Sequence, residues 1–150
     1  MDSLPDVSVT RADGTALPLA SLVGRPAVIY FYPKADTSGC TREALDFSTL
    51  DDAFVQAGVS VTGISKDPPA ALTRFAAKHG LSVTLASDDT GAACEAFGVW
   101  GQRSMYGRTY MGVARATFLF DRDGRLVREW RKVKVPGHAQ AVLDAVRELG

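Results

Sequence analysis

The sequence predicts an α/β domain built on a mixed central sheet with flanking helices. Short apolar runs typical of strands alternate along the chain with segments whose apolar residues recur every three or four positions, as in amphipathic helices. The alternation ends with a hairpin and a last helix, which makes the sheet mixed. A chain of 150 residues fits one domain and can bury a sizeable core, so we expect residues 1–150 to form a single unit.

The first elements are a hairpin and a central strand. Residues 5–24 carry alternating apolar positions around residues 12–14 (Ala-Asp-Gly), and Asp-Gly is a favoured hairpin turn. We therefore expect a small N-terminal β-hairpin. Residues 27–32 are continuously apolar, with three aromatics among them, which is typical of a strand buried on both faces. Pro33 should end this strand, because proline cannot donate to the sheet ladder.

A helix is predicted to start near Cys40. Residues 36–39 (Asp-Thr-Ser-Gly) are turn and cap residues, and Gly58 is a typical stop signal. Between them, apolar side chains recur at helical spacing, at Ala44, Phe47, Leu50, Phe54 and Ala57. The pattern thus places Cys40 in the first turn of a helix, just beyond the end of a central strand.

The middle of the chain is also predicted to alternate between strands and helices. Residues 59–64 predict a strand, after which Asp67 is expected to be the N-cap of a helix that has Pro68 at its first position. Gly80 should close that helix. Residues 81–85 predict another strand, followed by the cap-rich residues 87–90 and a short helix that ends at Gly98.

The last third begins with a segment of no clear periodicity. Residues 99–114, rich in Gly, Arg and aromatics, are predicted to form a long irregular loop, and long ordered loops are often functional. Strands are expected at 115–121 and 125–133, around the turn 122–124. A final helix should direct four apolar side chains inward: Val142, Leu143, Val146 and Leu149.

The predicted position of Cys40 favours a reactive thiol. Only the thiolate is nucleophilic, and a free cysteine is mostly protonated at neutral pH. The first turn of a helix offers unpaired N–H groups and the positive end of the helix dipole, which favour the anion, and a nearby arginine would add to this. Cysteine can also be an inert packing residue. The polar neighbours of Cys40, Thr-Ser-Gly before it and Thr-Arg-Glu after it, argue against that interpretation.

The residues around Cys40 resemble a known signature. The pattern Pro33-x-x-x-Thr37-x-x-Cys40 is similar to the active-site motif of the peroxiredoxins. The longer string from Phe31 to Ala44 resembles the bacterioferritin comigratory protein (BCP/PrxQ) subfamily, although Ser38 stands where that subfamily usually has proline. Similar blocks follow at residues 63–65, 87–88, 97–101 and 117–121. The resemblance implies a thioredoxin-like fold and a thiol-dependent peroxidase that reduces hydrogen peroxide and organic hydroperoxides through a sulfenic acid at Cys40.

The resemblance also assigns roles to other residues. Thr37 would offer its hydroxyl to the sulfur or to the peroxide, and it can also be an ordinary N-cap. Pro33 would shield the thiolate as well as end the strand. Glu43 would orient an arginine, or would be an exposed acid in the first helical turn. The arginine could be Arg42, Arg103, Arg108 or Arg115 on the residues alone, and the resemblance selects Arg115, at the head of a late strand.

Regeneration of the thiol is predicted to need an external reductant. The subfamily often has a resolving cysteine five residues after the nucleophile, which here is Leu45, and the helix expected to end at His79 has none either. Cys94 is interpreted as a half-buried packing residue, although unwinding of its helix could bring it closer. We therefore expect a one-cysteine mechanism, with thioredoxin, glutaredoxin or glutathione as the reductant.

Composition limits the partners, the compartment and the cofactors that can be expected for this protein. The 17 acidic and 17 basic residues give no electrostatic reason to expect nucleic acid or an anionic membrane as a partner. No signal peptide or apolar span stands out, and two distant cysteines do not form a secreted framework, so a cytoplasmic protein is expected. Neither a cofactor nor a metal is expected, because His79 and His138 do not pair with a cysteine at ligand spacing. The expected oligomeric state is a monomer or a weak homodimer.

An alternative function is disulfide exchange or redox binding on a thioredoxin-like scaffold. That chemistry uses a second cysteine three residues before the first, where this chain has Thr37. A non-catalytic stress or interaction protein on the same scaffold is a third hypothesis. Consumption of hydroperoxide coupled to a thiol reductant distinguishes the three.

Overall fold

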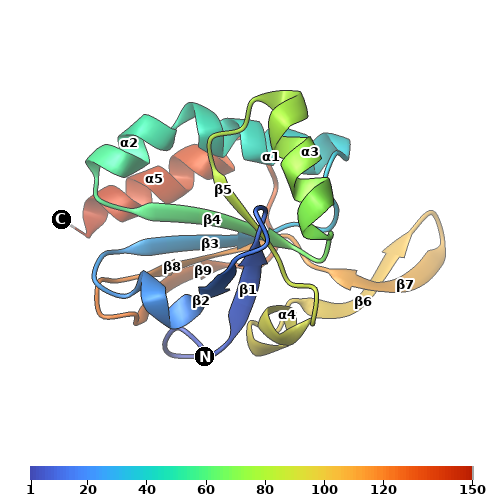
Figure 1. Cartoon of the computed structure of the whole chain (residues 1–150), viewed down its shortest axis with the longest axis horizontal. Helices are drawn as coiled ribbons and strands as arrows, with labels where there is room; N and C mark the ends of the chain where they lie inside the picture. The colour runs from blue at the N-terminus through green and yellow to red at the C-terminus, as the bar shows by residue number, and fades with distance from the viewer. Residues whose placement is uncertain (150) are drawn as a thin grey trace.

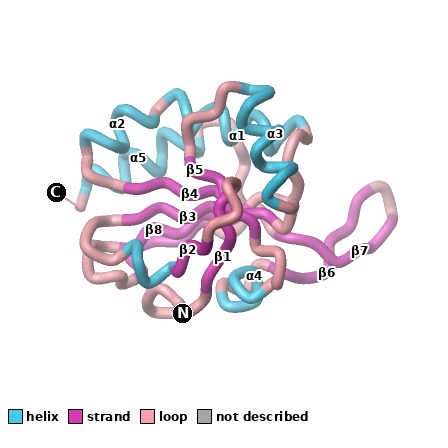
Figure 2. Tube along the Cα trace, viewed as in Figure 1, coloured by secondary structure: helices cyan, strands magenta, loops and turns pink. Residues whose placement is uncertain are grey.

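The chain folds around a seven-stranded mixed sheet, as the sequence predicts (Figures 1 and 2). The structure is a computed structural model that describes residues 1–149, apart from the side chain of Met105. The strand order is β2-β1-β5-β4-β3-β8-β9, in which β3, β4 and β5 are parallel and the outer pairings are antiparallel. Within residues 1–149, none of the helices has the length and apolar composition needed to cross a bilayer.

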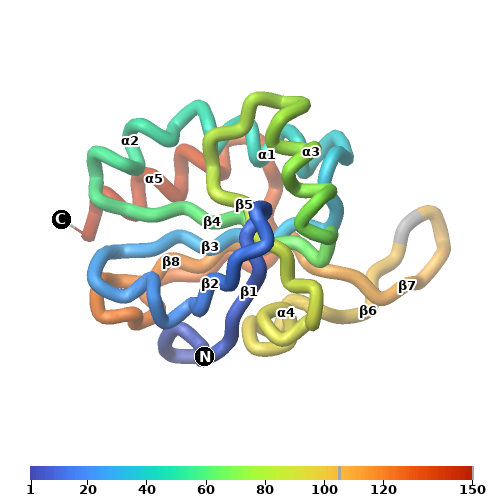
Figure 3. The backbone as a smooth tube through the Cα atoms, viewed as in Figure 1, coloured from blue at the N-terminus to red at the C-terminus, as the bar shows by residue number. Residues whose placement is uncertain are grey.

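The elements have the following bounds. The strands are β1 (Ser8–Arg11), β2 (Ala16–Pro18), β3 (Ala27–Phe31), β4 (Ser60–Ser65), β5 (Thr84–Ser87), β6 (Trp100–Met105), β7 (Arg108–Val113), β8 (Ala116–Phe120) and β9 (Leu126–Trp130). The helices are the 3-10 turn η1 (Leu19–Leu22), α1 (Ser38–Thr49), α2 (Asp51–Gln56), α3 (Pro69–His79), α4 (Ala92–Ala96) and α5 (His138–Glu148). Figure 3 follows the chain through them by residue number.

Two apolar cores lie on the two faces of the sheet. Val28 and Tyr30 of β3 point into a core built with α1, α2, α3 and α5, which we call the first face. Ile29 and Phe31 point into a second core that includes α4 and the N-terminal segment, the second face. All five residues of β3 are buried, so the prediction of a strand covered on both sides is confirmed.

The predicted N-terminal hairpin is present as β1 and β2. Thr10 pairs with Ala16, and the Asp13 carboxylate accepts hydrogen bonds from the backbone N–H and the hydroxyl of Thr15. Gly14 has a φ of 89°, which suits glycine in the tight turn.

The predicted helix from Cys40 to residue 57 is in fact two helices. The chain leaves helical geometry at Leu50, where φ is −93° and ψ is 5°. Asp51 and Asp52 then form the acidic first turn of α2, where their charges favour a new helix start. Gly58 follows with a positive φ of 76°, as expected for a stop.

The predicted cap of the next helix is displaced by one residue. Pro68 is the N-cap of α3 and Pro69 is its first residue, so Asp67 lies outside the helix. The Asp67 carboxylate instead accepts hydrogen bonds from the backbone N–H of Ala35 (2.7 Å) and from the hydroxyl of Ser65 (2.7 Å). It therefore ties the loop after β3 to the end of β4.

The largest correction concerns residues 99–114. They are not an irregular loop but a hairpin, β6–β7, that projects from the body of the molecule (Figure 1). Its two-residue turn has positive φ at both Tyr106 (53°) and Gly107 (77°), the combination that a type I′ turn requires. Both strands carry polar side chains on exposed positions, so the apolar alternation that reveals a buried strand is missing.

The other boundaries shift slightly. The strand expected at 81–85 is β5, which begins only at Thr84. The carboxylate of Asp88 caps α4 as expected, accepting the backbone N–H groups of Ala93 and Cys94. Three of the four predicted inward residues of α5 are buried, whereas Leu149, which follows the helix, is 38% exposed.

Gly63 is required by the packing of Tyr30, its register partner on β3. A Cβ at residue 63 would lie 2.5 Å from Cζ of the fully buried Tyr30 ring, which itself stacks on Phe47. We expect Gly63→Ala to lower the free energy of unfolding by about 1–3 kcal/mol, the usual cost of overpacking. Gly101→Ala is the matched control, because a Cβ there meets no atom within 4 Å. Urea unfolding of both variants measures the difference, and equal stabilities would contradict the packing argument.

Candidate active site

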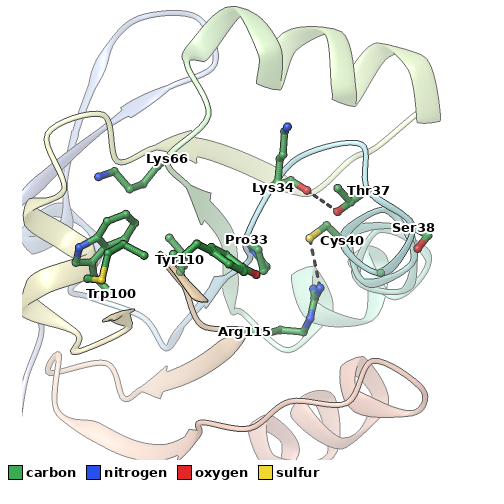
Figure 4. Close-up of a pocket in the computed structure, with 13 residues that line it drawn as sticks. Pro33, Lys34, Thr37, Ser38, Cys40, Lys66, Trp100, Tyr110 and Arg115 are labelled. Carbon is green, nitrogen blue, oxygen red and sulfur yellow. Dashed lines mark hydrogen bonds between the residues drawn. The ribbon is translucent and has the colours of Figure 1, made fainter. Parts of the chain in front are cut away.

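Cys40 lies where the sequence predicts it, in the first turn of α1 and beyond the end of β3. Its side chain is only 2% exposed, yet it lines a cavity of about 600 Å³. Three of the other four sequence-predicted residues, Pro33, Thr37 and Arg115, line the same cavity, and Glu43 lies behind it (Figure 4). The thiol is thus shielded from bulk water but open to a pocket.

Sheet register brings Arg115 to Cys40 from 75 residues away in the chain. In the antiparallel pairing of β3 with β8, Phe31 lies opposite Ala116, so Arg115 stands at the end of β3 where α1 begins. Its Nη2 donates to Sγ of Cys40 at 3.3 Å (Figure 4). A Cβ on residue 39 would lie 3.1 Å from the same Nη2, so Gly39 leaves room for the guanidinium.

Glu43 completes the cluster one helical turn after Cys40. Its Oε1 accepts a hydrogen bond from Nη1 of Arg115 at 2.8 Å, and its side chain is 1% exposed. The alternative of an exposed first-turn acid is therefore wrong. Burial raises the pKa of Glu43 to about 7, and the charge of Arg115 only partly opposes this. Burial by itself lowers the pKa of Arg115, but its interaction with Glu43 and its hydrogen bonds to Glu43 and Cys40 raise it above its ordinary value.

Thr37 occupies the N-cap position of α1, but its hydroxyl makes no capping bond. The hydroxyl donates to the backbone carbonyl of Lys34 at 2.7 Å. Because the hydroxyl proton is used there, the oxygen presents its lone pairs to the pocket as an acceptor.

The loop that carries Thr37 is fastened to α3. Asp36 has a positive φ of 63°, which is uncommon outside glycine. Its carboxylate accepts a hydrogen bond from Nζ of Lys78 and contacts Nε2 of His79, and both distances are 2.8 Å. Together with the bond from Ala35 to Asp67, these contacts hold the start of α1 in place.

The other three candidate arginines lie elsewhere. Arg42 is exposed on α1, and Arg108 is exposed beside the turn of the β6–β7 hairpin. Arg103 donates to the backbone carbonyl of Val99. None of the three lines the pocket around Cys40.

Cys94 lies on the other side of the sheet from Cys40. It is fully buried in the core of the second face, whereas Cys40 belongs to the first. Cys94 is thus more deeply buried than the sequence suggested. Burial raises the pKa of the Cys94 thiol well above its ordinary value, and the nearby Asp88 carboxylate adds to this.

One wall of the pocket was not predicted from the sequence. Trp100, Tyr110, Met111 and Val113 come from the β6–β7 hairpin, and Lys66 follows β4. The only local signal for this wall was the Tyr-Gly pair at the hairpin turn. No group of three His, Cys, Asp or Glu side chains in residues 1–149 is arranged to hold a metal ion.

A thiol at a helix start, faced by a guanidinium on a thioredoxin-like sheet, defines the class of thiol-dependent peroxidases. Comparison with known proteins identifies the family: residues 1–129 match the model of the AhpC/TSA family, and the chain belongs to it. It is a peroxiredoxin of the BCP/PrxQ type, as the sequence predicts, and it acts on peroxide with electrons from a thiol reductant.

Individual relatives agree with this assignment. The chain is 44% identical over 142 residues to peroxiredoxin Bcp of Xanthomonas campestris, covering 95% of this chain and 89% of the relative. It is 42% identical over 147 residues to peroxiredoxin Bcp of Escherichia coli, covering 98% and 94%. A solved structure of a mutant X. campestris peroxiredoxin Q, 41% identical, superposes with a TM-score of 0.92 over 100% of both chains.

Proposed function

We propose that Cys40, Arg115, Glu43, Thr37 and Pro33 form the site at which this peroxidase reduces hydrogen peroxide and organic hydroperoxides. The contact between Arg115 and Sγ of Cys40, at 3.3 Å, carries the proposal. It supplies a permanent positive charge to a nucleophile that must be an anion. The X. campestris bacterioferritin comigratory protein is described by its alkyl peroxide reduction activity, which supports including organic hydroperoxides.

The first step is a displacement at oxygen. The Cys40 thiolate attacks the terminal oxygen of R–O–O–H, the S–O bond forms as the O–O bond breaks, and the electron pair leaves with RO⁻. The sulfur becomes a sulfenic acid, Cys–SOH, and RO⁻ takes a proton from solvent to give ROH. Arg115 donates toward the oxygen atoms on which charge develops, in a pocket that limits the access of water.

The remaining residues position the reactants. Glu43 fixes one Nη of Arg115 and leaves the other directed at Sγ. The hydroxyl oxygen of Thr37 accepts a hydrogen bond from the O–H group of the hydroperoxide, because its own proton is donated to the carbonyl of Lys34. Pro33 covers the pocket wall without offering an N–H that would compete for the substrate.

We propose a one-cysteine cycle. An external thiol attacks the sulfenic acid to give a mixed disulfide and water, and a second thiol then releases the Cys40 thiol. The placement of Cys94 supports this, because its thiol faces the core on the opposite side of the sheet. Leu45 occupies the position five residues after Cys40.

Mass spectrometry of the intact protein tests this cycle. After one equivalent of peroxide, without reductant, we expect a monomer heavier by one oxygen atom, and dimedone should trap the sulfenic acid on Cys40. The Cys94→Ala variant should give the same product. A stable monomer lighter by two hydrogens, lost in Cys94→Ala, would mean that Cys94 resolves the sulfenic acid and that the cycle uses two cysteines.

The physiological setting is also proposed. Thioredoxin, glutaredoxin or glutathione supplies the thiol, and a reducing compartment such as the cytoplasm suits two cysteines that are both free. Residues 1–150 act as one peroxiredoxin domain, as a monomer or a weak homodimer. Peroxide turnover with each thiol system in turn identifies the reductant, and the expected result is sustained turnover with at least one of them.

A further inference from the structure

The tip of the β6–β7 hairpin carries an aromatic residue that its backbone conformation disfavours. Tyr106 has a φ of 53°, in the left-handed region, where a bulky residue is a rare exception. Asparagine is the usual residue before the glycine of such a type I′ turn. Tyr106 is also 96% exposed, so packing within the chain does not compensate for the strain. A strained and exposed aromatic residue points to a functional reason for its presence.

Apolar side chains lie on both faces of the hairpin as well as at its tip. Tyr110 and Met111 are consecutive residues of β7, so they point to opposite faces of the two-stranded sheet. They are 46% and 55% exposed. The hairpin projects from the body of the molecule (Figures 1 and 2). A folded partner would cover one face, whereas the headgroup region of a lipid bilayer can surround both faces and the tip.

The charge of the hairpin is entirely positive. Arg103 and Arg108 are its only charged residues, and the chain has no Asp or Glu from residue 96 to residue 120. Lys66 adds a cation at the base of the hairpin, where its ammonium lies 4.2 Å from the centroid of the Trp100 ring. The equal totals of 17 acidic and 17 basic residues therefore conceal a local excess of positive charge. An anionic surface that approaches the hairpin meets only cations on it.

We propose that the β6–β7 hairpin is a docking surface for an anionic lipid membrane. Tyr106 enters the headgroup region first, with Tyr110 and Met111 behind it. Arg103 and Arg108 then pair with lipid phosphates. The aromatic rings suit this depth, because each has an apolar body and a polar group. Insertion is shallow, since β6 and β7 pair only with each other in the described structure and the N–H and C=O groups of their outer edges need water.

Cosedimentation with vesicles measures the proposed binding. The comparison is between vesicles of phosphatidylcholine alone and vesicles that also contain phosphatidylglycerol, at low ionic strength and without peroxide or reductant. The protein should bind the anionic vesicles, bind the neutral vesicles about fivefold more weakly, and dissociate as salt is added. An absence of binding to the anionic vesicles, or equal binding to both kinds, would overturn the proposal. Because no peroxide is present, the result does not depend on the chemistry of Cys40.

Tyr106→Asn separates the aromatic ring from the turn. Asparagine before glycine favours a type I′ turn, so the hairpin should be kept. Affinity for the anionic vesicles should fall about threefold, because the amphipathic ring is lost, and Tyr106→Trp should retain the affinity. Turnover of hydrogen peroxide should be the same in both variants as in the unmodified protein, since Tyr106 does not line the pocket. Unchanged vesicle binding by Tyr106→Asn would contradict the proposal.

A pair of arginine variants distinguishes the hairpin from the rest of the surface. Arg108→Gln should weaken binding about fivefold, the effect of about 1 kcal/mol per cation near an anionic surface. The control is Arg147→Gln, which removes the same charge from an exposed position on α5, at the opposite end of the molecule (Figure 1). This control should bind like the unmodified protein. Equal losses in the two variants would mean that the vesicles do not select the hairpin, and would exclude it as the docking surface.

Two further measurements test depth and the competing occupant. Brominated lipids quench tryptophan rings that enter a bilayer, so the fluorescence of Tyr106→Trp should be quenched more than that of the unmodified protein. Equal quenching would place the tip outside the membrane and contradict the proposal. Sedimentation without lipid tests a second copy of the chain as the occupant. A dimer that is lost in Tyr106→Asn, together with no vesicle binding, would make the tip a protein interface instead.

Discussion

Cys40→Ser should abolish hydroperoxide turnover while leaving the fold intact. Removing the nucleophile of an enzyme commonly costs a factor of about 10⁴ or more. A serine hydroxyl does not ionise at neutral pH, so Arg115 would face a neutral oxygen with no electron pair ready to attack. The hydroxyl is close in size to the thiol and can still accept the hydrogen bond from Arg115. The measurement is peroxide consumption with dithiothreitol, together with circular dichroism and urea unfolding to check the fold.

The matched control is the other cysteine. Cys94 is fully buried in a different core from Cys40, and Cys94→Ala leaves the pocket untouched. This variant should keep the rate of peroxide reduction, with some loss of stability from the small cavity. If Cys40→Ser retained turnover, the assignment of the nucleophile would fail, and a loss confined to Cys94→Ala would move the chemistry to the second face.

The parts of the fold that bury apolar side chains could be predicted from the sequence. β3 and α5 place their hydrophobic residues in the core at strand and helix spacing, and that spacing is visible without a structure. The hairpin at residues 99–114 could not be recognised in this way. Most of its side chains are solvent-exposed, and its strands pair only with each other, so no burial pattern marks them.

The residues of the candidate site also fall into two groups, those that the sequence places together and those that only the fold brings together. Thr37, Cys40 and Glu43 are neighbours in sequence, and their spacing already places them at one helix start. Arg115 comes from β8, and only the register between β3 and β8 brings it to the sulfur. The residues themselves left four arginines open, and the family resemblance made the choice. The resemblance gave no role to Lys66 or Trp100, because their place in the pocket wall depends on where the hairpin folds back.

Two buried groups near Arg115 should make stability depend on pH in opposite directions. Burial raises the pKa of Glu43 from 4.5 to about 7. It lowers the pKa of His138 from 6.5 to about 4, and the charge of Arg115 adds to this shift. His138 is 7% exposed and hydrogen-bonded to the Thr117 hydroxyl, two residues after Arg115. Each shift is worth about 3 kcal/mol.

The signs follow from proton binding. The folded protein holds a proton on Glu43 more tightly than the unfolded chain, so this contribution is full below pH 4.5 and is lost as pH rises through about 7. The folded protein keeps His138 neutral, so that contribution is full above pH 6.5 and is lost as pH falls through about 4. Between about pH 4.5 and 6.5 the two slopes cancel, and together they should leave the free energy of unfolding nearly constant there.

Glu43→Gln should reveal the pH dependence of the free energy of unfolding that His138 causes and that Glu43 cancels. The amide cannot titrate, but its oxygen can still accept the hydrogen bond from Arg115, so only the proton linkage of residue 43 is removed. Relative to the unmodified protein, the variant should gain about 3 kcal/mol of stability between pH 4.5 and pH 7. Urea unfolding at closely spaced pH values measures this difference directly, and it subtracts every group that titrates alike in both proteins.

His138→Gln should change the pH dependence of stability in the opposite direction and by a similar amount. It removes the imidazole but keeps a polar group within reach of Thr117, so the variant should lose stability relative to the unmodified protein as pH rises from 4 to 6.5. Opposite slopes in the two variants would show that Arg115 is held between a carboxyl that resists ionisation and an imidazole that resists protonation. Parallel profiles for both variants and the unmodified protein would contradict that, and would mean that Glu43 is ionised at acidic pH like an exposed acid.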